Sequence, residues 1–463
     1  MTTDRLSWRE LFGYALPAIP TAALALPLTV YVAPFYAQQV RLGTGLVGVL
    51  FFAVRAIDIA FDPLIGLAGD RIDTRWGRRR PWLVAIVPPM LVAVFAFFNP
   101  PAHAGALYLV VCLLAVYFGF SVLTISHTAW GAELSGAYHE RSRIAGARQI
   151  AFIGGMLLVL ILPAILELRF GVGAREKVSA MGWFVIAGLP SAVGLAVTLT
   201  GEPRHAPPGD FGIRASWQWL RKSRVLRSVL AADLTIGLAT SITAALYLFL
   251  IDKTFALKHS STLLLCYFVA ALAGAPVWTR LSYRFGKHRT LAGAALSGAA
   301  MLPFFFLVPR DGTGGELAFL LTAIFGLSYG AGPVLLHAIM GDVVDQETAE
   351  SGDRRAGAAF ALLTLTNKIG YALSVGVTYP LLDLIGFSGR QDAANSPDAL
   401  MGILVVFVAF PATLLITSAA FLWRFPLGER EQLRLRSQIA EGLTASFVIH
   451  RIPAALPPTR RCP

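Results

Sequence analysis

Three charged side chains lie inside an apolar stretch that is long enough to cross a membrane. The residues from Val47 to Gly69 are almost all aliphatic or aromatic, yet they include Arg55, Asp58 and Asp62. Each ionised side chain near the centre of a bilayer costs roughly 2.5–3.5 kcal/mol to insert. The spacing of three and then four residues places all three on one face of a helix. We therefore expect this face to line a polar interior, where such charges usually mark the path of an ion or a substrate.

The two aspartates are one helical turn apart, a spacing at which two carboxylates can share a cation or exchange a proton. Pro63 has no N–H, so the carbonyl of Ile59 loses its usual helical partner and becomes available as a further oxygen ligand. We interpret Asp58 and Asp62 as the binding site of a coupling cation, with Na⁺ as the metal that they would hold. The alternative is a structural ion pair between Arg55 and Asp58, with Asp62 near the membrane interface.

A lysine lies deep in another apolar run. Lys368 is about 12 residues inside the run at 356–385, which corresponds to a depth of about 18 Å at 1.5 Å per residue. Its ammonium does not easily reach the surface of a hydrocarbon core of about 30 Å, so it needs an acidic partner. Asp58 and Asp62 are the natural choice, as part of an ion site or as a fixed structural pair. With an ammonium in the charge balance, H⁺ could replace Na⁺ as the coupling ion.

The composition requires a membrane protein built from helices. Of 463 residues, 56% are hydrophobic and 14% are charged, whereas soluble proteins carry about 25% charged residues. The apolar runs are continuous over about 20 residues, whereas strands of a membrane barrel alternate over about 10. Twelve transmembrane helices are predicted, at 11–36, 43–69, 82–99, 105–128, 146–166, 179–199, 226–250, 262–282, 289–308, 316–340, 356–385 and 400–423.

Basic residues gather in alternate loops. The loops after the second, fourth, eighth and tenth runs and the link between the sixth and seventh are basic, whereas the loops between them hold few Lys or Arg. By the positive-inside rule, both termini and the central link are expected in the cytoplasm. The formal charge of +12 therefore reflects membrane orientation, and no nucleic-acid partner is expected.

The two halves of the chain repeat a loop signature. Arg71-Ile-Asp-Thr-Arg75-Trp-Gly77-Arg78 recurs 209 residues later as Arg280-Leu-Ser-Tyr-Arg284-Phe-Gly286-Lys287. A weaker echo relates 143–147 to 354–358 at an offset of 211. Two signatures at nearly one offset imply duplicated six-helix units with a solute site between them, which is the plan of a major facilitator. The expected domains are an N-terminal bundle at 1–199, a cytoplasmic link with an interfacial helix at 200–225, a C-terminal bundle at 226–425 and a cytoplasmic, partly disordered tail at 426–463.

Several motifs together point to one family. They are Arg55-Ala-Ile-Asp58-Ile-Ala-Phe-Asp62-Pro63 with Gly66 and Asp70, Arg75-Trp-Gly-Arg78 to Pro81-Trp82, Gly45-Leu-Val-Gly48 to Phe51, and Asp342-Val-Val-Asp345 with Gly352, Arg354 and Lys368. In these motifs the chain resembles the melibiose-permease-like glycoside–pentoside–hexuronide:cation symporters of the major facilitator superfamily. The resemblance covers both halves. It implies an all-α membrane protein of twelve helices in two six-helix bundles, in which Asp58 and Asp62 bind the cation and Lys368 approaches them.

Six residues are predicted to contact the solute: Arg55, Ser126, His127, Trp130, Arg148 and Asn367. The resemblance places Trp130 at the family's aromatic position in the fourth span and Arg148 at a substrate position in the fifth. His127 titrates near neutral pH and could relay protons or bind the solute. The alternatives are an interfacial tryptophan, a snorkelling arginine and a structural histidine. Ala22 and Ser126 stand where sugar-transporting members carry acids, so galactoside recognition does not transfer to this chain.

The repeated loops predict a cytoplasmic gate. Their arginines would bridge to helix ends and acids when that side is closed, and would release them when it opens. Glu133 is expected to pair with loop arginines. The predicted gating residues are Asp70, Arg71, Arg75, Arg78, Glu133, Arg141, Arg280, Arg284, Asp342 and Asp345.

These features predict a monomeric secondary transporter in the cytoplasmic (inner) membrane, surrounded by lipid. It would move a sugar or glycoside-like solute together with H⁺ or Na⁺ by alternating access. Because Ala22 and Ser126 lack charge, the alternative is a less polar solute, such as a lysolipid or a glycosylated small molecule, on the same fold. The sequence holds no phosphate loop, nucleophile elbow or zinc-binding motif, so neither an enzyme nor a cofactor is expected.

Overall fold

The computed structural model of the chain describes residues 5–71, 74, 76–135, 138–201, 213–351, 356–390, 393–423, 425 and 434. Over this part of the chain the secondary structure is almost entirely helical. Twelve helical segments are long and apolar enough to cross a membrane, and each coincides with one of the twelve predicted runs. The chain is therefore a multi-pass membrane protein.

The helices fall into two halves joined by a short helix. The N-terminal half holds α1 (Trp8–Ala15), α2 (Ala18–Val30), α3 (Val32–Gln38), α4 (Thr44–Arg71), α5 (Arg80–Phe98), α6 (Ala106–Glu133), α7 (Tyr138–Phe170) and α8 (Ala174–Leu199). The joining helix is α9 (Ile213–Lys222), inside the predicted link. The C-terminal half holds α10 (Arg224–Phe249), η1 (Leu250–Thr254), α11 (Ser260–Phe285), α12 (Lys287–Met301), η2 (Leu302–Leu307), α13 (Gly315–Tyr329), α14 (Ala331–Ser351), α15 (Ala356–Leu384) and α16 (Pro397–Trp423). The tail predicted at 426–463 lies outside the described residues, apart from Arg434.

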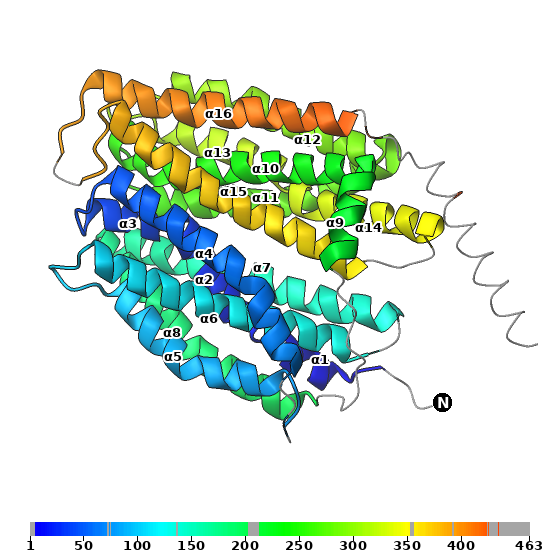
Figure 1. Ribbon diagram of the computed structural model, residues 1–463. Helices are drawn as coiled ribbons and strands as arrows, with labels where there is room; N and C mark the ends of the chain where they lie inside the picture. Colours follow the sequence, from blue (N-terminus) through cyan, green and yellow to red (C-terminus); the bar gives the residue numbers. More distant parts are fainter. Residues whose placement is uncertain are drawn as a thin grey trace, which may run out of the picture.

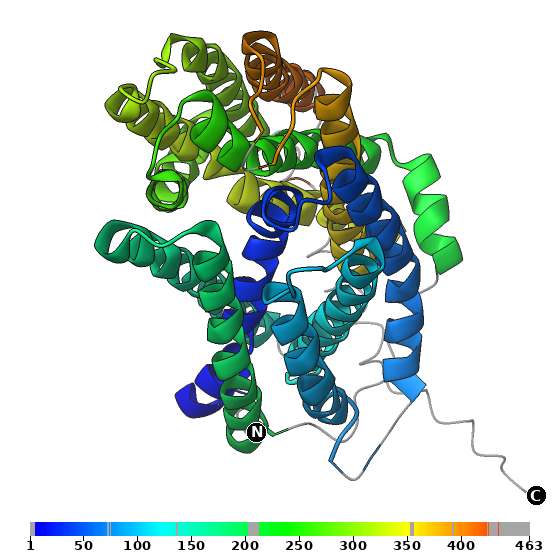
Figure 2. The same cartoon turned by 90° about the vertical axis from the view of Figure 1, so that its left-hand side faces the viewer.

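The two halves form two helical bundles that lie side by side (Figures 1 and 2). Helices α4 and α15 run next to each other along the boundary between them (Figure 1). We call the end that carries α9 and the start of α1 the α9 end, and the opposite end, with α3 and the start of α4, the α3 end. Figure 2 looks onto the α3 end.

Proline and helix-forming residues explain where the helices differ from the predicted runs. The run at 11–36 is divided among α1, α2 and α3, and Pro17 precedes the first residue of α2. A proline has no N–H to continue the preceding helix, so the chain bends there. The run at 316–340 is instead too short: α14 continues to Ser351, because the polar residues that follow the run are of types that helices tolerate. Asp342 and Asp345 are consequently helical rather than part of a loop.

The repeated loop signature has a backbone cause. Gly77, just before α5, has φ of 109°, and Gly286, just before α12, has φ of 83°. Positive φ values in this range are accessible to glycine and strained for other residues. The two glycines therefore make equivalent turns in the two halves.

Helices α4 and α15 approach most closely toward the α3 end. A Cβ atom added to Gly48 would lie 2.6 Å from Cβ of Tyr379, and one added to Gly376 would lie 2.6 Å from Cβ of Phe52. Contacts this short require that both positions lack a side chain. Glycine on each helix therefore lets the two halves close against each other at the α3 end.

Candidate functional site

A cluster of charges joins the two halves at the middle of α4. Lys368 of α15 donates hydrogen bonds to Asp58 (Nζ–Oδ2 3.1 Å) and to Asp62 (Nζ–Oδ2 2.5 Å), both on α4. Arg55 donates to the same oxygen of Asp58 at 3.2 Å. Ser121 of α6 donates to the other Asp58 oxygen at 2.8 Å. The structure therefore brings together Arg55, Asp58, Asp62 and Lys368, as the sequence predicts.

The ammonium of Lys368 has all three of its donors occupied. Besides the two aspartates, it donates to the hydroxyl oxygen of Ser121 at 3.0 Å. Two cations and two carboxylates make the cluster neutral, and the side chain of Asp58 is only 3% exposed. A neutral, hydrogen-bonded set of charges is the form in which ionised groups are tolerated at membrane depth. Within the described part of the chain, no group of three or more His, Cys, Asp or Glu side chains is placed to hold a metal ion.

Two atoms of the cluster keep unused hydrogen-bonding capacity. Oδ1 of Asp62 and Nε of Arg55 are buried and have no hydrogen-bond partner among the described residues. The Asp62 side chain is 24% exposed, and it is the more accessible of the two aspartates. A cation that entered the site would thus meet a free carboxylate oxygen at Asp62. The residues present that fit a Na⁺ ion are Asp58, Asp62 and Ser121, provided that Lys368 moves away.

The residues predicted on α6 lie in a packed aromatic region. Trp130 is fully buried, with its ring centroid 5.7 Å from that of Tyr14. His127 is also buried, and its Nε2 lies 2.7 Å from the carbonyl oxygen of Tyr14. Ser126 is 4% exposed. Tyr14 of α1 packs against His127 and Trp130, and the predicted contact of the three side chains with the solute stays a prediction.

The other two predicted solute residues lie on opposite halves. Arg148 of α7 is half-buried and makes no hydrogen bond or ion pair within the described part of the chain. Asn367 of α15 donates to Asp233 of α10 (Nδ2–Oδ2 3.1 Å), which also accepts from the Thr366 hydroxyl. Asn367 thus faces α10, away from α4.

Three polar residues of the boundary region were not predicted from the sequence: Asp233, Ser121 and Tyr117. Asp233 is a buried carboxylate in the seventh apolar run, so the signal used for α4 would have found it. Ser121 and Tyr117 carry no such signal, because hydroxyl and aromatic side chains are ordinary in transmembrane helices. The guanidinium of Arg55 lies 4.3 Å from the ring centroid of Tyr117, in cation–π contact.

Two of the predicted gate residues, Glu133 and Asp342, form equivalent ion pairs in the two halves. Arg79 at the start of α5 donates to Glu133 at the end of α6 (2.8 Å). Lys287 at the start of α12 donates to Asp342 of α14 (2.7 Å). The acids are 209 positions apart and the bases 208, so the pairs follow the sequence repeat. Glu133 and Asp342 were predicted, whereas Arg79 and Lys287 were not among the predicted gating residues.

The other predicted gate residues are either described without a matching pair or lie outside the described part of the structure. Arg280 and Arg284 at the end of α11 are exposed, and Arg284 lies over the ring of Phe285. Arg78 and Asp345 are half-buried near the α9 end. Arg75 and the side chains of three further predicted residues, Asp70, Arg71 and Arg141, lie outside the described part of the structure.

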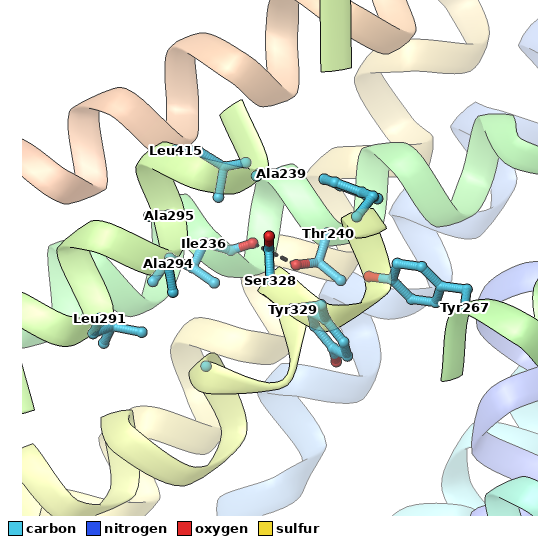
Figure 3. A pocket seen from close by; sticks show the side chains of 13 residues that line it. Ile236, Ala239, Thr240, Tyr267, Leu291, Ala294, Ala295, Ser328, Tyr329 and Leu415 are labelled. Carbon is cyan, nitrogen blue, oxygen red and sulfur yellow. Dashed lines mark hydrogen bonds between the residues drawn. The ribbon is translucent and has the colours of Figure 1, made fainter. Parts of the chain in front are cut away.

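Two cavities differ sharply in their relation to the charges. One, of about 420 Å³, lies inside the C-terminal bundle and is lined mainly by apolar side chains (Figure 3). Its lining also includes the hydroxyl-bearing residues Thr240, Tyr267 and Ser328. The other, of about 350 Å³, lies between the halves and has Arg55 in its wall. We call the second the boundary cavity. Because the boundary cavity touches the charged cluster, it is the better candidate for a solute site.

The fold and the membrane-buried charges define a transporter of the major facilitator superfamily, rather than an enzyme. Residues 13–429 match the family model described as MFS/sugar transport protein, and the chain belongs to that family. This membership confirms the resemblance drawn from the motifs around Asp58.

Individual relatives are similar over their full length. The chain is 23% identical to a glucuronide carrier protein homolog of Escherichia coli (strain K12), over 92% of this chain and 94% of the relative. It is 24% identical to the inner membrane symporter YicJ of the same organism, over 96% of this chain and 97% of the relative. Among solved structures, the nucleoside transporter NupG (D323A mutant) superimposes with a TM-score of 0.66 at 14% identity, covering 89% of this chain and 99% of NupG.

Proposed function

We propose that this protein is a symporter that couples a sugar or glycoside-like solute to a cation gradient. The observation that carries the proposal is the cluster in which Lys368 of one half binds Asp58 and Asp62 of the other. Alternating access requires the halves to move relative to each other about a central site. These ion pairs cross the boundary, so that motion must stretch or break them.

The cluster offers a way to couple the ion to the motion. A cation that binds the free oxygen of Asp62 competes with Lys368 for the carboxylates, and so weakens a contact between the halves. Asp58, Asp62 and Ser121 would hold Na⁺, or an aspartate would take up H⁺. A ligand shifts a conformational equilibrium only through different affinities for the two states, and competition with Lys368 supplies such a difference.

The orientation and the division into two moving units are part of the proposal. The protein lies in the inner membrane. The basic loops support an orientation in which the α9 end, with both termini and the central link, faces the cytoplasm. The closely packed glycines then close the periplasmic side. The moving units are the predicted bundles at 1–199 and 226–425, and a monomer contains a complete site.

The choice of solute rests on the relatives and on the boundary cavity. One relative is named for glucuronides, and the family description names sugar transport. Arg55, Tyr117 and Tyr371 give the cavity polar and aromatic groups of the kind that bind sugars. Leu28, Phe51 and Val375 in the same wall favour the second candidate, a more amphipathic solute such as a lysolipid or glycosylated small molecule.

Transport by purified protein in proteoliposomes tests the proposal. The probes are radiolabelled D-glucose, D-xylose, D-glucuronate and lactose, each with and without a Na⁺ gradient and with and without a pH gradient. We expect at least one sugar to accumulate above equilibrium with one of the gradients. Accumulation of none, together with thermal stabilisation by lysophosphatidylcholine alone, would replace the sugar with the amphipathic solute.

A further inference from the structure

One buried acid of the C-terminal bundle differs from the other buried acids in its partners. Among the described residues, five acidic side chains are buried: Asp58, Glu140, Glu167, Asp233 and Asp342. Four of them form an ion pair with a Lys or an Arg. The exception is Asp233 of α10, which is 4% exposed and has no cationic partner in the described part of the chain. A buried charge is normally paired, so Asp233 must be neutralised in another way.

Asp233 also lies deep in the membrane. It is the tenth residue of α10, which begins at Arg224 and belongs to a membrane span that ends at Thr254. At 1.5 Å per residue, Asp233 is about 14 Å along that span, close to the middle of a hydrocarbon core of about 30 Å. An isolated carboxylate at this depth is costly, and binding of a proton removes the charge.

The elements around α10 bring no positive charge to Asp233. Helix α10 packs against α2, α3, α9, α14, α15, α16 and η1. The basic and histidine side chains described on α10 and on these elements are Arg221, Lys222, Arg224, Arg227, Lys253, His337 and Lys368. The first four are exposed at the α9 end, and Lys253 lies at the α3 end. His337 contacts the Pro333 carbonyl of its own helix, and the donors of Lys368 go to α4 and α6. The other titratable groups on these elements are acids and tyrosines, among them Tyr371 of α15.

The hydrogen bonds around Asp233 also favour a neutral carboxyl. Helices α10 and α15 lie side by side (Figure 1), and Oγ1 of Thr366 on α15 is in hydrogen-bond contact with Oδ2 of Asp233. The same Oγ1 lies 3.2 Å from the carbonyl oxygen of Leu362 and 2.9 Å from that of Leu363. A threonine hydroxyl has a single hydrogen, which in a helix commonly goes to such a carbonyl. The contact between Thr366 and Asp233 then requires a hydrogen from the carboxyl.

The amide of Asn367 completes this arrangement. Its Nδ2 donates to the Leu363 carbonyl at 2.9 Å and to the carboxyl of Asp233 at 3.1 Å from Oδ2 and 3.3 Å from Oδ1. One amide hydrogen is therefore available for the carboxyl. An ionised carboxylate offers about four acceptor sites, and two neutral side chains fill few of them. A protonated carboxyl needs fewer donors and uses its own hydrogen toward Thr366.

We propose that Asp233 is a proton-binding site of the C-terminal half, separate from the cation site on α4, and that it holds its proton in this conformation. The proton lies on Oδ2 and is donated to Oγ1 of Thr366, while Oδ1 accepts from Asn367. Lys368 follows Asn367 directly on α15. The charge of Asp233 therefore acts on the helix that also carries the ammonium of the cation site.

Infrared absorption of the purified protein tests the site with the proton itself as the ligand. The carbonyl stretch of a protonated carboxyl is distinct from the bands of a carboxylate. We expect the wild type to show this absorption, Asp233→Asn to lose one component of it, and the control Asp58→Asn to retain that component. Raising the pH should remove the same component reversibly. An unchanged spectrum in Asp233→Asn would overturn the proposal, and so would a component that persists up to the pH at which the protein unfolds.

Two further variants' properties check the assignment independently. Thr366→Val keeps the shape of the side chain and removes its oxygen, so the component should move to higher frequency. Asp233→Asn replaces a neutral carboxyl with a neutral amide and should unfold at the wild-type temperature, whereas Asp58→Asn removes a paired charge and should unfold earlier. An unshifted component in Thr366→Val, or an Asp233→Asn protein that unfolds as early as Asp58→Asn, would overturn the proposal. These measurements need no transported solute, so their outcome is independent of the proposed sugar transport.

Discussion

Glu167 and Asp383 are equivalent residues of the two halves, and each caps the first turn of a helix in the opposite half. Asp383 of α15 accepts from the backbone N–H of Gly45 in α4 at 2.8 Å. Glu167 of α7 accepts from the backbone N–H of Ser261 in α11 at 3.1 Å. Both pairs of equivalent positions differ by 216 residues. Two symmetry-related carboxylates therefore hold the α3 end closed at helix N-termini, where negative charge is favoured.

Removing both carboxylates should open the α3 end. A capping interaction contributes about 1 kcal/mol, so the double variant Glu167→Ala/Asp383→Ala, which removes both acceptors, should shift the equilibrium toward the open state by about 30-fold. The readout is labelling of Ala372→Cys, in a background without the native cysteines, by an impermeant maleimide added at the α3 end.

Asp311→Ala is the matched control for these carboxylates. Asp311 lies at the same end of the molecule, and its described hydrogen bonds go to Thr313 of its own loop. Its replacement should leave the labelling rate unchanged. Equal labelling of the wild type and the double variant would show that these caps do not hold the halves together.

Breaking the charged cluster one partner at a time should be more harmful than removing a balanced pair. Lys368→Met leaves the two carboxylates with Arg55 as their remaining cationic partner. The loss should lower the free energy of unfolding by roughly 3–5 kcal/mol. The double variant Lys368→Met/Asp62→Asn removes one charge of each sign and should regain much of the thermal stability. Neither variant should accumulate solute. A Lys368→Met protein as stable as the wild type would argue against a buried, mutually neutralising cluster.

Asp58→Asn tests the coupling role directly. The amide keeps the shape of the side chain and removes its charge, so Asp58 no longer balances Arg55 and Lys368. We expect gradient-driven accumulation in proteoliposomes to be abolished, while exchange of labelled for unlabelled solute is reduced less. Full uphill accumulation by this variant would exclude Asp58 as a coupling residue.

A side chain at Gly376 should wedge the halves apart. The Cβ of Gly376→Ala would lie 2.6 Å from Cβ of Phe52 on α4, so the helices must separate at that level. We expect faster labelling from the α3 end by the assay above, because only the closed state is strained. Gly293→Ala on α12 is the control, since an added Cβ there meets nothing within 4 Å. If Gly293→Ala raised the labelling rate equally, the effect would come from the higher helix propensity of alanine and not from separation of the halves.

The pair of Lys287 and Asp342 should tolerate exchange but not reversal of one charge. Lys287→Asp would replace the cationic partner of Asp342 with a second negative charge, and the rate of accumulation should fall. Lys287→Asp/Asp342→Lys restores opposite charges and should recover part of that rate. If the double variant accumulates solute no faster than Lys287→Asp alone, other contacts of these two residues determine the rate.

The sequence alone determined the parts of this protein that depend on local pattern. Apolar runs of about 20 residues predict membrane helices because lipid offers no partner for the backbone. The spacing of Arg55, Asp58 and Asp62 fixes one helical face, and the depth of Lys368 requires an acid nearby. The loop signature repeated around Gly77 and Gly286 predicted the duplicated halves. It is also a local pattern, because both glycines make the same turn.

Only the tertiary structure decided which groups meet across the boundary. Lys368 and Asp58 are 310 positions apart, and Glu167 meets Ser261 only because the two halves close at the α3 end. The hydroxyls around the boundary cavity, on Tyr117 and Tyr371, have no charge that would reveal them in an apolar run. Contacts of this kind depend on how two separate bundles dock, and no periodicity within one helix encodes that geometry.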